Sequence, residues 1–394
     1  MTIANFVNRP QTPMKLWPAL GKKSINPDTY SWDNGLYLHN CTKNPYVIRW
    51  VMATKEADPE KRHDQAYLVL LGRPKDSNEA FTRLGQLTSV EDFGIAWSGC
   101  LIGIPNHESS WISEMGPFTE HGRINLPFEL QDQTLCMAFT SATSVENDPG
   151  NYHQRIMLGY IDSNGGFQVA EKPLLDPQDS EAERLGYDTK IDSKVIQAWR
   201  DPYHFRDHEG KQHMLFAAKY KPELQEKHPL NFSFDPNRNS AIGHATFEDN
   251  KWVLQPPILL GNPSAQFELP TVVQHNGSYY MFMLDADWGY EGDKQTKRFN
   301  TLKLYKSDRV TGPWLPHGRH ENGEPTATIL DFTRDDLKVY GVSVLQDDSG
   351  LHFSAFDDTT IQLLDPLTMP SYELDDPDNF SHKLDRQFRL MLSR

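Results

Sequence analysis

The chain has 394 residues, of which 39 are Lys or Arg and 54 are Asp or Glu, so its formal net charge is −15. Polyanion binding requires a basic face, and no Lys/Arg-rich run occurs, so neither nucleic acid nor an anionic membrane is an expected partner. The cysteines Cys41, Cys100 and Cys136 lack the spacing of a disulfide framework or zinc site, and the last two lie in apolar runs typical of buried free thiols.

Residues 1–25 are expected to form an N-terminal arm. This segment lacks the basic-then-apolar layout of a signal peptide, and no apolar run in the sequence approaches membrane-spanning length. The expected location is therefore cytoplasmic, with secretion without a classical signal peptide as the alternative.

Short β-rich runs bordered by turn residues follow one another along the chain, whereas helical periodicity is rare. Turn pairs include Asn34-Gly35, Asn164-Gly165, Asn276-Gly277 and Ser349-Gly350. The predicted strands are Tyr46–Met52, Ala66–Leu71, Leu135–Thr140, Arg155–Ile161, His213–Ala217, Ser278–Leu284, Thr301–Lys306 and Leu351–Phe356. Many short strands with few helices indicate an all-β barrel, sandwich or propeller.

A weak internal repeat favours the propeller. Two units begin at Arg200-Asp201-Pro202 and Glu268-Leu269-Pro270, and each continues through an apolar strand, a tight turn, an aromatic-rich strand and a further strand pair. This is the four-stranded meander of a propeller blade. Three looser units near Ser31, Ala96 and Val339 bring the number to five. Because no linker-like composition divides the chain, residues 1–394 are predicted to form a single five-bladed β-propeller domain.

Three of these units carry a carboxylate at the start of their first strand: Asp33, Asp201 and Glu268. The first strand of each blade lines the central channel, so equivalent positions in different blades converge on the axis. A retaining glycosidase needs a carboxylate nucleophile and a protonated carboxylic acid about 5–5.5 Å apart. Burial and like-charge repulsion separate the pKa values of such a pair. The sequence therefore predicts a glycosidase-type active site in a central funnel.

Neighbouring side chains fit the same chemistry. Arg200 is expected to hold the adjacent aspartate ionised, and Trp32 and Trp97 offer faces on which a sugar could stack. Ser98 and Gln266 offer neutral hydrogen bonds. The 15 histidines show no metal-ligating spacing and no nucleotide-binding motif occurs, so no metal and no cofactor are expected.

At these residues the sequence resembles the levansucrase, inulosucrase and β-fructofuranosidase group of five-bladed propeller enzymes, glycoside hydrolase family 68. The matching motifs are Trp32-Asp33, Trp97-Ser98-Gly99, Arg200-Asp201-Pro202, the region of Gln266 and Glu268, and Tyr340. The resemblance implies that Asp33 is the nucleophile, Glu268 the general acid and Asp201 the transition-state stabiliser. It implies a small carbohydrate substrate, sucrose or a related β-fructofuranoside, bound by Trp32, Trp97, Ser98, Arg200, Gln266 and Tyr340.

Two positions depart from the family pattern. Leu269 stands where the family has an Arg that helps to bind the leaving glucose, and Ala96 stands where a Glu precedes Trp-Ser-Gly. The resemblance therefore indicates a retained fructosyl pocket and an altered leaving-group pocket. Two other readings stay open: an arabinofuranoside-cleaving propeller enzyme with the same carboxylate layout, and a non-catalytic sugar-binding propeller derived from such an enzyme.

Overall fold

The computed structural model describes residues 29–40, 45–58, 61–77, 79–130, 132–145, 151–190, 197–225, 238–261, 264, 266–291, 294–319, 324–333, 337–358, 360 and 362–393, without the side chains of residues 287–299. The expected N-terminal arm, residues 1–25, and Cys41 lie outside these ranges. Cys100 and Cys136 are buried and free, as predicted.

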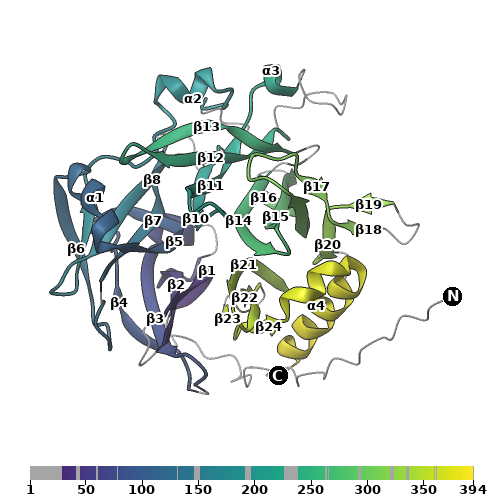
Figure 1. The fold of residues 1–394 in the computed structure, drawn as a ribbon, viewed down its shortest axis with the longest axis horizontal. Coiled ribbons are helices and arrows are strands. Elements are labelled where there is room, and N and C mark those ends of the chain that lie inside the picture. The colour runs from purple at the N-terminus through teal and green to yellow at the C-terminus, as the bar shows by residue number, and fades with distance from the viewer. Residues whose placement is uncertain are drawn as a thin grey trace.

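Five antiparallel blades surround a central axis (Figure 1), the first two of them joined into one nine-stranded sheet. The first blade consists of β1 (Tyr30–His39), β2 (Tyr46–Thr54), β3 (Tyr67–Pro74) and β4 (Thr82–Gln86). The second consists of β5 (Ile95–Pro105), β7 (Gln133–Ser144), β8 (Tyr152–Ile161), β9 (Gly166–Ala170) and β6 (Phe118–Ile124). The third consists of β10 (Trp199–Arg206), β11 (Gln212–Lys219), β12 (Ser240–Glu248) and β13 (Lys251–Leu260).

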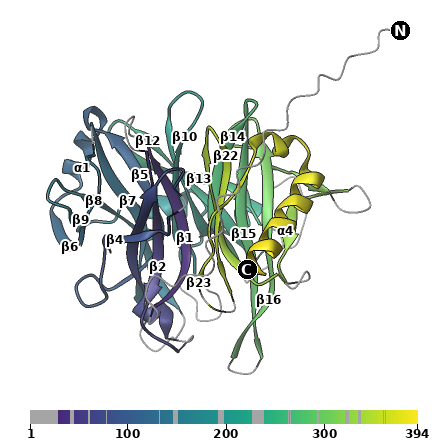
Figure 2. The same cartoon turned by 90° about the horizontal axis from the view of Figure 1, so that it is seen from below.

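The last two blades have more irregular outer edges. The fourth consists of β14 (Gln266–His275), β15 (Ser278–Glu291), β16 (Lys294–Ser307), β17 (Leu315–Pro316) and β20 (Thr328–Asp331), beside the small pair β18 (Gly318–Arg319) and β19 (Pro325–Thr326). The fifth consists of β21 (Val339–Asp347), β22 (Gly350–Asp357), β23 (Gln362–Leu363) and β24 (Leu367–Met369). Seen from below, β15 and β16 extend beyond the neighbouring strands (Figure 2).

The innermost strands β1, β5, β10, β14 and β21 form a closed ring, because each contacts the innermost strands on both sides. The predicted all-β, five-bladed propeller is therefore confirmed. The outer edges of the first two blades are also joined, since β4 pairs with β6 through Gly85 and Ile124. Every residue of β2 is buried. This explains its continuous apolar run, which is typical of a strand packed on both faces.

All eight predicted strands form, but one predicted turn is wrong. Asn34-Gly35 lies inside β1, where a Cβ on Gly35 would overlap the indole ring of Trp50. The glycine here permits close packing of β1 on β2 and does not reverse the chain.

Short helical segments lie between strands: η1 (Arg62–Gln65), η2 (Asn106–Glu108), η3 (Ser371–Asp375), α1 (Ser110–Glu114), α2 (Ser180–Arg184) and α3 (Pro222–Gln225). The longer helix α4 (Pro377–Leu392) was not predicted from the sequence. Asp376 caps it by accepting a hydrogen bond from the backbone N–H of Asn379 at 3.3 Å. Its buried residues recur every fourth position, at Phe380, Leu384 and Phe388. No helix in the described ranges is both long and apolar enough to cross a membrane.

The first and last blades are joined by a buried guanidinium. Arg49 on β2 is 2% exposed, and its Nε donates to Asn34 Oδ1 at 2.9 Å. Its Nη1 donates to the carbonyl of Leu364 at 2.8 Å and its Nη2 to that of Ala355 at 3.0 Å. One side chain therefore links β1, which carries Asp33, to the fifth blade where the ring closes.

Replacement of Arg49 by Met is expected to lower the free energy of unfolding by about 2–5 kcal/mol, because Asn34 Oδ1 and the Leu364 carbonyl lose this donor and the Ala355 carbonyl keeps only the Leu364 N–H. The measurement is equilibrium unfolding in urea, with Arg83→Met as the matched control. Arg83 is exposed on β4 of the same blade, so its loss is expected to change stability by less than about 0.5 kcal/mol. Equal effects of the two substitutions would contradict a role of Arg49 in ring closure.

Candidate active site

Each innermost strand is interrupted by a β-bulge. A bulge bends its strand and redirects side chains. The residue before the bulge and the first residue within it occupy corresponding positions in all five blades. These pairs are Trp32-Asp33, Trp97-Ser98, Arg200-Asp201, Glu268-Leu269 and Tyr340-Gly341. All of the predicted site residues except Gln266 belong to them, and hydrogen bonds between blades join several of them.

The carboxylates do not occupy fully equivalent positions, which corrects the argument from the repeat. Glu268 aligns with Arg200 before the bulge, and Leu269 aligns with Asp201 inside it. Asp201, Leu269 and Gly341 have positive φ angles of 57°, 50° and 61°. Such a conformation is uncommon for a bulky residue such as leucine. Glu268 therefore reaches the site from a position one residue earlier than the repeat predicts.

Leu269 contributes its backbone to the site. The side chain is 5% exposed and packs in the hydrophobic core. Its N–H donates to Asp201 Oδ2 at 3.2 Å. The site therefore has no exposed leucine side chain at this position, and the bulge helps to hold Asp201.

Asp201 is held from three directions. Ser98 Oγ donates to its Oδ1, the Leu269 N–H to its Oδ2, and Arg200 Nε lies 3.7 Å from its Oδ2. Its own N–H donates to Thr140 Oγ1 at 3.0 Å. Burial nevertheless raises the pKa of Asp201 and outweighs the lowering effect of Arg200. Arg200 thus acts in the expected direction by lowering this pKa, but it does not offset the effect of burial.

Glu268 is oriented by two donors. Arg200 Nη2 donates to its Oε1 at 3.2 Å, and the Tyr340 hydroxyl donates to its Oε2. The same Arg200 nitrogen also donates to Gln266 Oε1. Burial, followed by the charge of Glu268, raises the pKa of Tyr340 well above its usual value, so the phenol stays a donor. Both carboxylate oxygens of Glu268 thus have defined directions.

Asp33 differs from the other two carboxylates because its Oδ1 is buried without a hydrogen-bond partner among the described residues. Gly341 makes room for it, since a Cβ there would lie 3.1 Å from this oxygen and 2.7 Å from the ring of Phe356. Desolvation, with added repulsion from Asp201 and Glu268, raises the pKa of Asp33 well above its usual value. The raised pKa disfavours the ionised form that a nucleophile needs, whereas the carboxyl oxygen without a hydrogen-bond partner is the feature that fits an attacking role.

The raised pKa predicts that Asp33 destabilises the folded protein at neutral pH. Its carboxyl ionises in the unfolded chain near pH 4, but at higher pH in the folded protein, so stability falls as pH rises between the two values. Asp33→Asn is expected to raise Tm by a few degrees at pH 7, and this gain should vanish below about pH 3.5. Thermal unfolding of both proteins across pH measures it. A lower Tm of the variant at pH 7 would contradict the assigned sign.

The two tryptophans are packed rather than open. Trp32 is 4% and Trp97 is 8% exposed. His63 stacks over Trp32 at a centroid distance of 5.6 Å, and Arg62 Cζ lies 5.7 Å from the Trp32 ring. Trp97 packs against Tyr152 at 4.6 Å. The expectation of two free stacking faces is corrected: η1, which carries Arg62 and His63, covers Trp32. No motif in the sequence marked these two residues.

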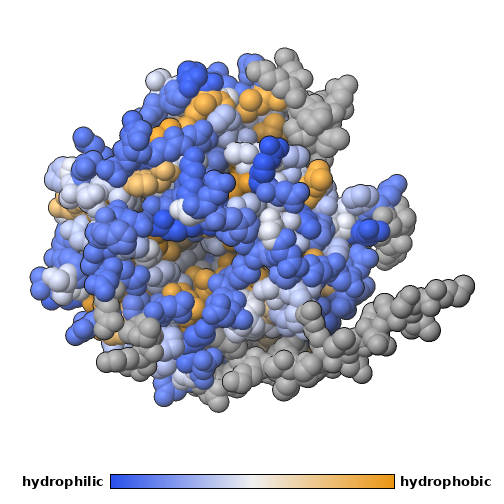
Figure 3. Space-filling model, viewed as in Figure 1, coloured by the Kyte–Doolittle hydropathy of each residue, from blue (hydrophilic) through white to orange (hydrophobic). Residues whose placement is uncertain are grey.

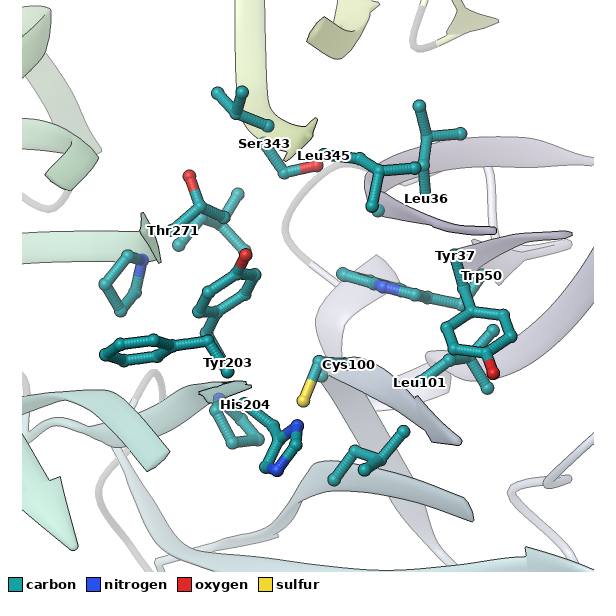
Figure 4. Close-up of a pocket in the computed structure, with 18 of the residues that line it drawn as sticks. Leu36, Tyr37, Trp50, Cys100, Leu101, Tyr203, His204, Thr271, Ser343 and Leu345 are labelled. Atoms are coloured by element: carbon teal, nitrogen blue, oxygen red, sulfur yellow. The ribbon is translucent and has the colours of Figure 1, made fainter. Parts of the chain in front are cut away.

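A cavity of about 250 Å³ lies along the same inner strands (Figure 4). Its lining includes Asp201, Pro202 and Leu269 at the bulges and mostly residues that follow them, such as Cys100 and His204. Asp33 and Glu268 do not line it. The cavity therefore adjoins the carboxylate cluster on the far side of the bulges. On the face shown in Figure 3, the surface is hollowed near the centre of the ring, with apolar residues among hydrophilic ones.

Comparisons with known proteins support the fold. No protein-family model matches the sequence, and no curated protein matches it significantly. Among solved structures, Bacillus subtilis levansucrase is similar with a TM-score of 0.56 at 14% identity over 88% of this chain and 85% of that one. A levansucrase variant complexed with sucrose gives 0.55 at 14% identity over the same shares. A B. megaterium levansucrase variant gives 0.54 at 14% identity over 88% and 84%. The chain thus has a levansucrase-like fold.

Proposed function

We propose that the protein is a retaining glycosidase that transfers the fructosyl unit of sucrose or a related β-fructofuranoside to water or to another sugar. The observation that carries this proposal is that Asp33, Asp201 and Glu268 come from three blades and lie close enough for their charges to act on one another, while inter-blade hydrogen bonds hold Asp201 and Glu268. One of them, Asp33, has an unpaired oxygen, and Glu268 is oriented by two donors. The fold shared with levansucrases, one of them complexed with sucrose, supports the choice of a fructosyl unit.

In the first step, an oxygen of Asp33 attacks the anomeric carbon as the bond to the glycosidic oxygen breaks, and Glu268 gives its proton to that oxygen. In the second step, Glu268 takes a proton from water or an acceptor hydroxyl, whose oxygen displaces Asp33 from the fructosyl unit. Asp201, fixed by Ser98 and the Leu269 N–H, hydrogen-bonds sugar hydroxyls throughout. Two displacements retain the configuration at the anomeric carbon.

The proposal is tested by incubating the wild type with sucrose and measuring released glucose and fructose, with Asp33→Ala as the inactive comparison. Equal amounts indicate hydrolysis, and an excess of glucose indicates transfer. A panel containing arabinofuranosides tests the neighbouring glycosidase specificity. Sugar binding without turnover, unchanged in Asp33→Ala, would favour a sensing role. Absence of turnover with every fructoside tested overturns the proposal.

A further inference from the structure

The segment η1 is fixed between the first two blades at the edge of the carboxylate cluster. It lies between β2 and β3, yet its contacts reach the second blade. Trp97 Nε1 donates to the carbonyl of His63 at 3.2 Å. Asp64 Oδ1 accepts from the Tyr152 hydroxyl at 2.7 Å and from Ser144 Oγ at 3.3 Å. These bonds give η1 a defined position, so the side chains of Arg62 and His63 are presented from a rigid support.

Arg62 has hydrogen-bonding capacity that the protein does not use. Its side chain is half-buried over Trp32, and its Nε is inaccessible to water without a hydrogen-bond partner among the described residues. The charges of Asp358 and Asp33 act on it, but no described carboxylate lies within ion-pair distance. A guanidinium has five N–H donors, and an unpaired buried donor is costly. The two Nη groups of Arg62 are not among the buried atoms and have no hydrogen-bond partner among the described residues, so they are the donors open to another molecule.

Arg200, the arginine that contacts Asp201 and Glu268, has no comparable free donors. Arg200 donates to Gln197, Gln266 and Glu268, so its guanidinium is already engaged within the protein. Leu269 is buried in the core. Among the described cations that contact or act on the three carboxylates, Arg62 is thus the one with free donors.

We propose that Arg62 binds hydroxyl groups of the leaving group and makes the enzyme selective for fructosides whose leaving group is a neutral sugar or polyol. The planar guanidinium presents paired donors that match adjacent hydroxyls. The ring of His63 beside it stacks on Trp32 and adds a flat surface next to Arg62. An anionic leaving group is disfavoured because Asp33, Glu268 and Asp358 surround the site with negative charge. This inference rests on the proposed fructosyl transfer.

The test compares wild type and Arg62→Met on sucrose and on β-fructofuranosyl fluoride, whose leaving group has no hydroxyls. Methionine keeps an apolar stem over Trp32 and removes the donors. We expect kcat/KM for sucrose to fall about 10–100-fold, because the leaving group loses its hydrogen bonds to a charged donor. kcat/KM for fructosyl fluoride should stay unchanged. The apparent pKa of the acidic limb of its pH–rate profile should also stay unchanged. Arg83→Met serves as control, and Arg62→Leu, which also lacks the donors, is used if the methionine variant does not fold.

The possible outcomes distinguish failure of the Arg62 inference from failure of the proposed function. Equal losses on both substrates, or a shifted acid limb, would show that Arg62 acts through Asp33 and overturn the inference. Unchanged sucrose efficiency in the variant overturns the inference and leaves the proposed function standing. A wild type that turns over neither substrate overturns the proposed function, and with it the inference.

Discussion

Asp33→Asn is expected to lower kcat/KM for sucrose by about 10⁴-fold or more, since removal of a nucleophile from a preorganised site leaves only the binding contribution. Asparagine has nearly the same shape as aspartate, so packing against Gly341 and Phe356 should be kept. The measurement is the initial rate of glucose release, with protein concentration corrected for folded fraction. The same variant is expected to be more stable at pH 7, so lost activity cannot be ascribed to unfolding.

Asp92→Asn is the matched control for this experiment. Asp92 is exposed and exchanges hydrogen bonds with Ser89 in the connection between β4 and β5. Its replacement is expected to leave kcat/KM unchanged. Retention of more than a few per cent of wild-type activity by Asp33→Asn would assign the nucleophile to another residue.

Glu268→Gln is expected to lower kcat for sucrose by about 10²–10⁴-fold, the usual contribution of a positioned proton donor. Fructosyl fluoride needs little protonation of its leaving group, so its first step should stay fast in the same variant. Glutamine keeps one oxygen to accept from Arg200 or Tyr340, which preserves the orientation of the side chain. The measurement is a stopped-time assay of fluoride release, in which a burst followed by slow turnover is expected.

The control is Glu248→Gln, at the end of β12 and away from the carboxylate cluster, where Glu248 pairs with Lys211. It should behave as the wild type with both substrates. Equal losses of Glu268→Gln on sucrose and on the fluoride, without a burst, would mean that Glu268 binds the sugar and does not transfer the proton.

Most of the fold can be predicted from local sequence patterns. Alternating or continuous apolar runs bordered by Gly, Asn and Asp predicted the eight strands, and the repeat predicted five blades. The helix α4 was missed although Asp376, Pro377 and the fourfold spacing from Phe380 are ordinary helix-start signals. The turn predicted at Asn34-Gly35 was wrong because the packing of Trp50 on Gly35 is a tertiary contact.

The site was only partly predictable for the same reason. Asp33, Asp201 and Glu268 were predicted from the repeat, but a bulge shifts register by one residue, and no local pattern showed that Glu268 aligns with Arg200. Burial raises the pKa of Asp201 even though the neighbouring Arg200 lowers it. Arg62 reaches the site only because contacts with the second blade fix η1. All three effects depend on tertiary contacts, so no pattern of a few neighbouring residues could have predicted them.

Intact-protein and peptide mass spectrometry of Glu268→Gln after acid quenching with fructosyl fluoride tests the central claim most directly. Without the base that activates water, the covalent intermediate should accumulate. The predicted result is a mass increase of one fructosyl unit on the peptide that contains Asp33, absent when Asp33 is also replaced by Asn. An adduct on a different residue, or burst kinetics without any adduct, would contradict the assignment of Asp33 as the nucleophile.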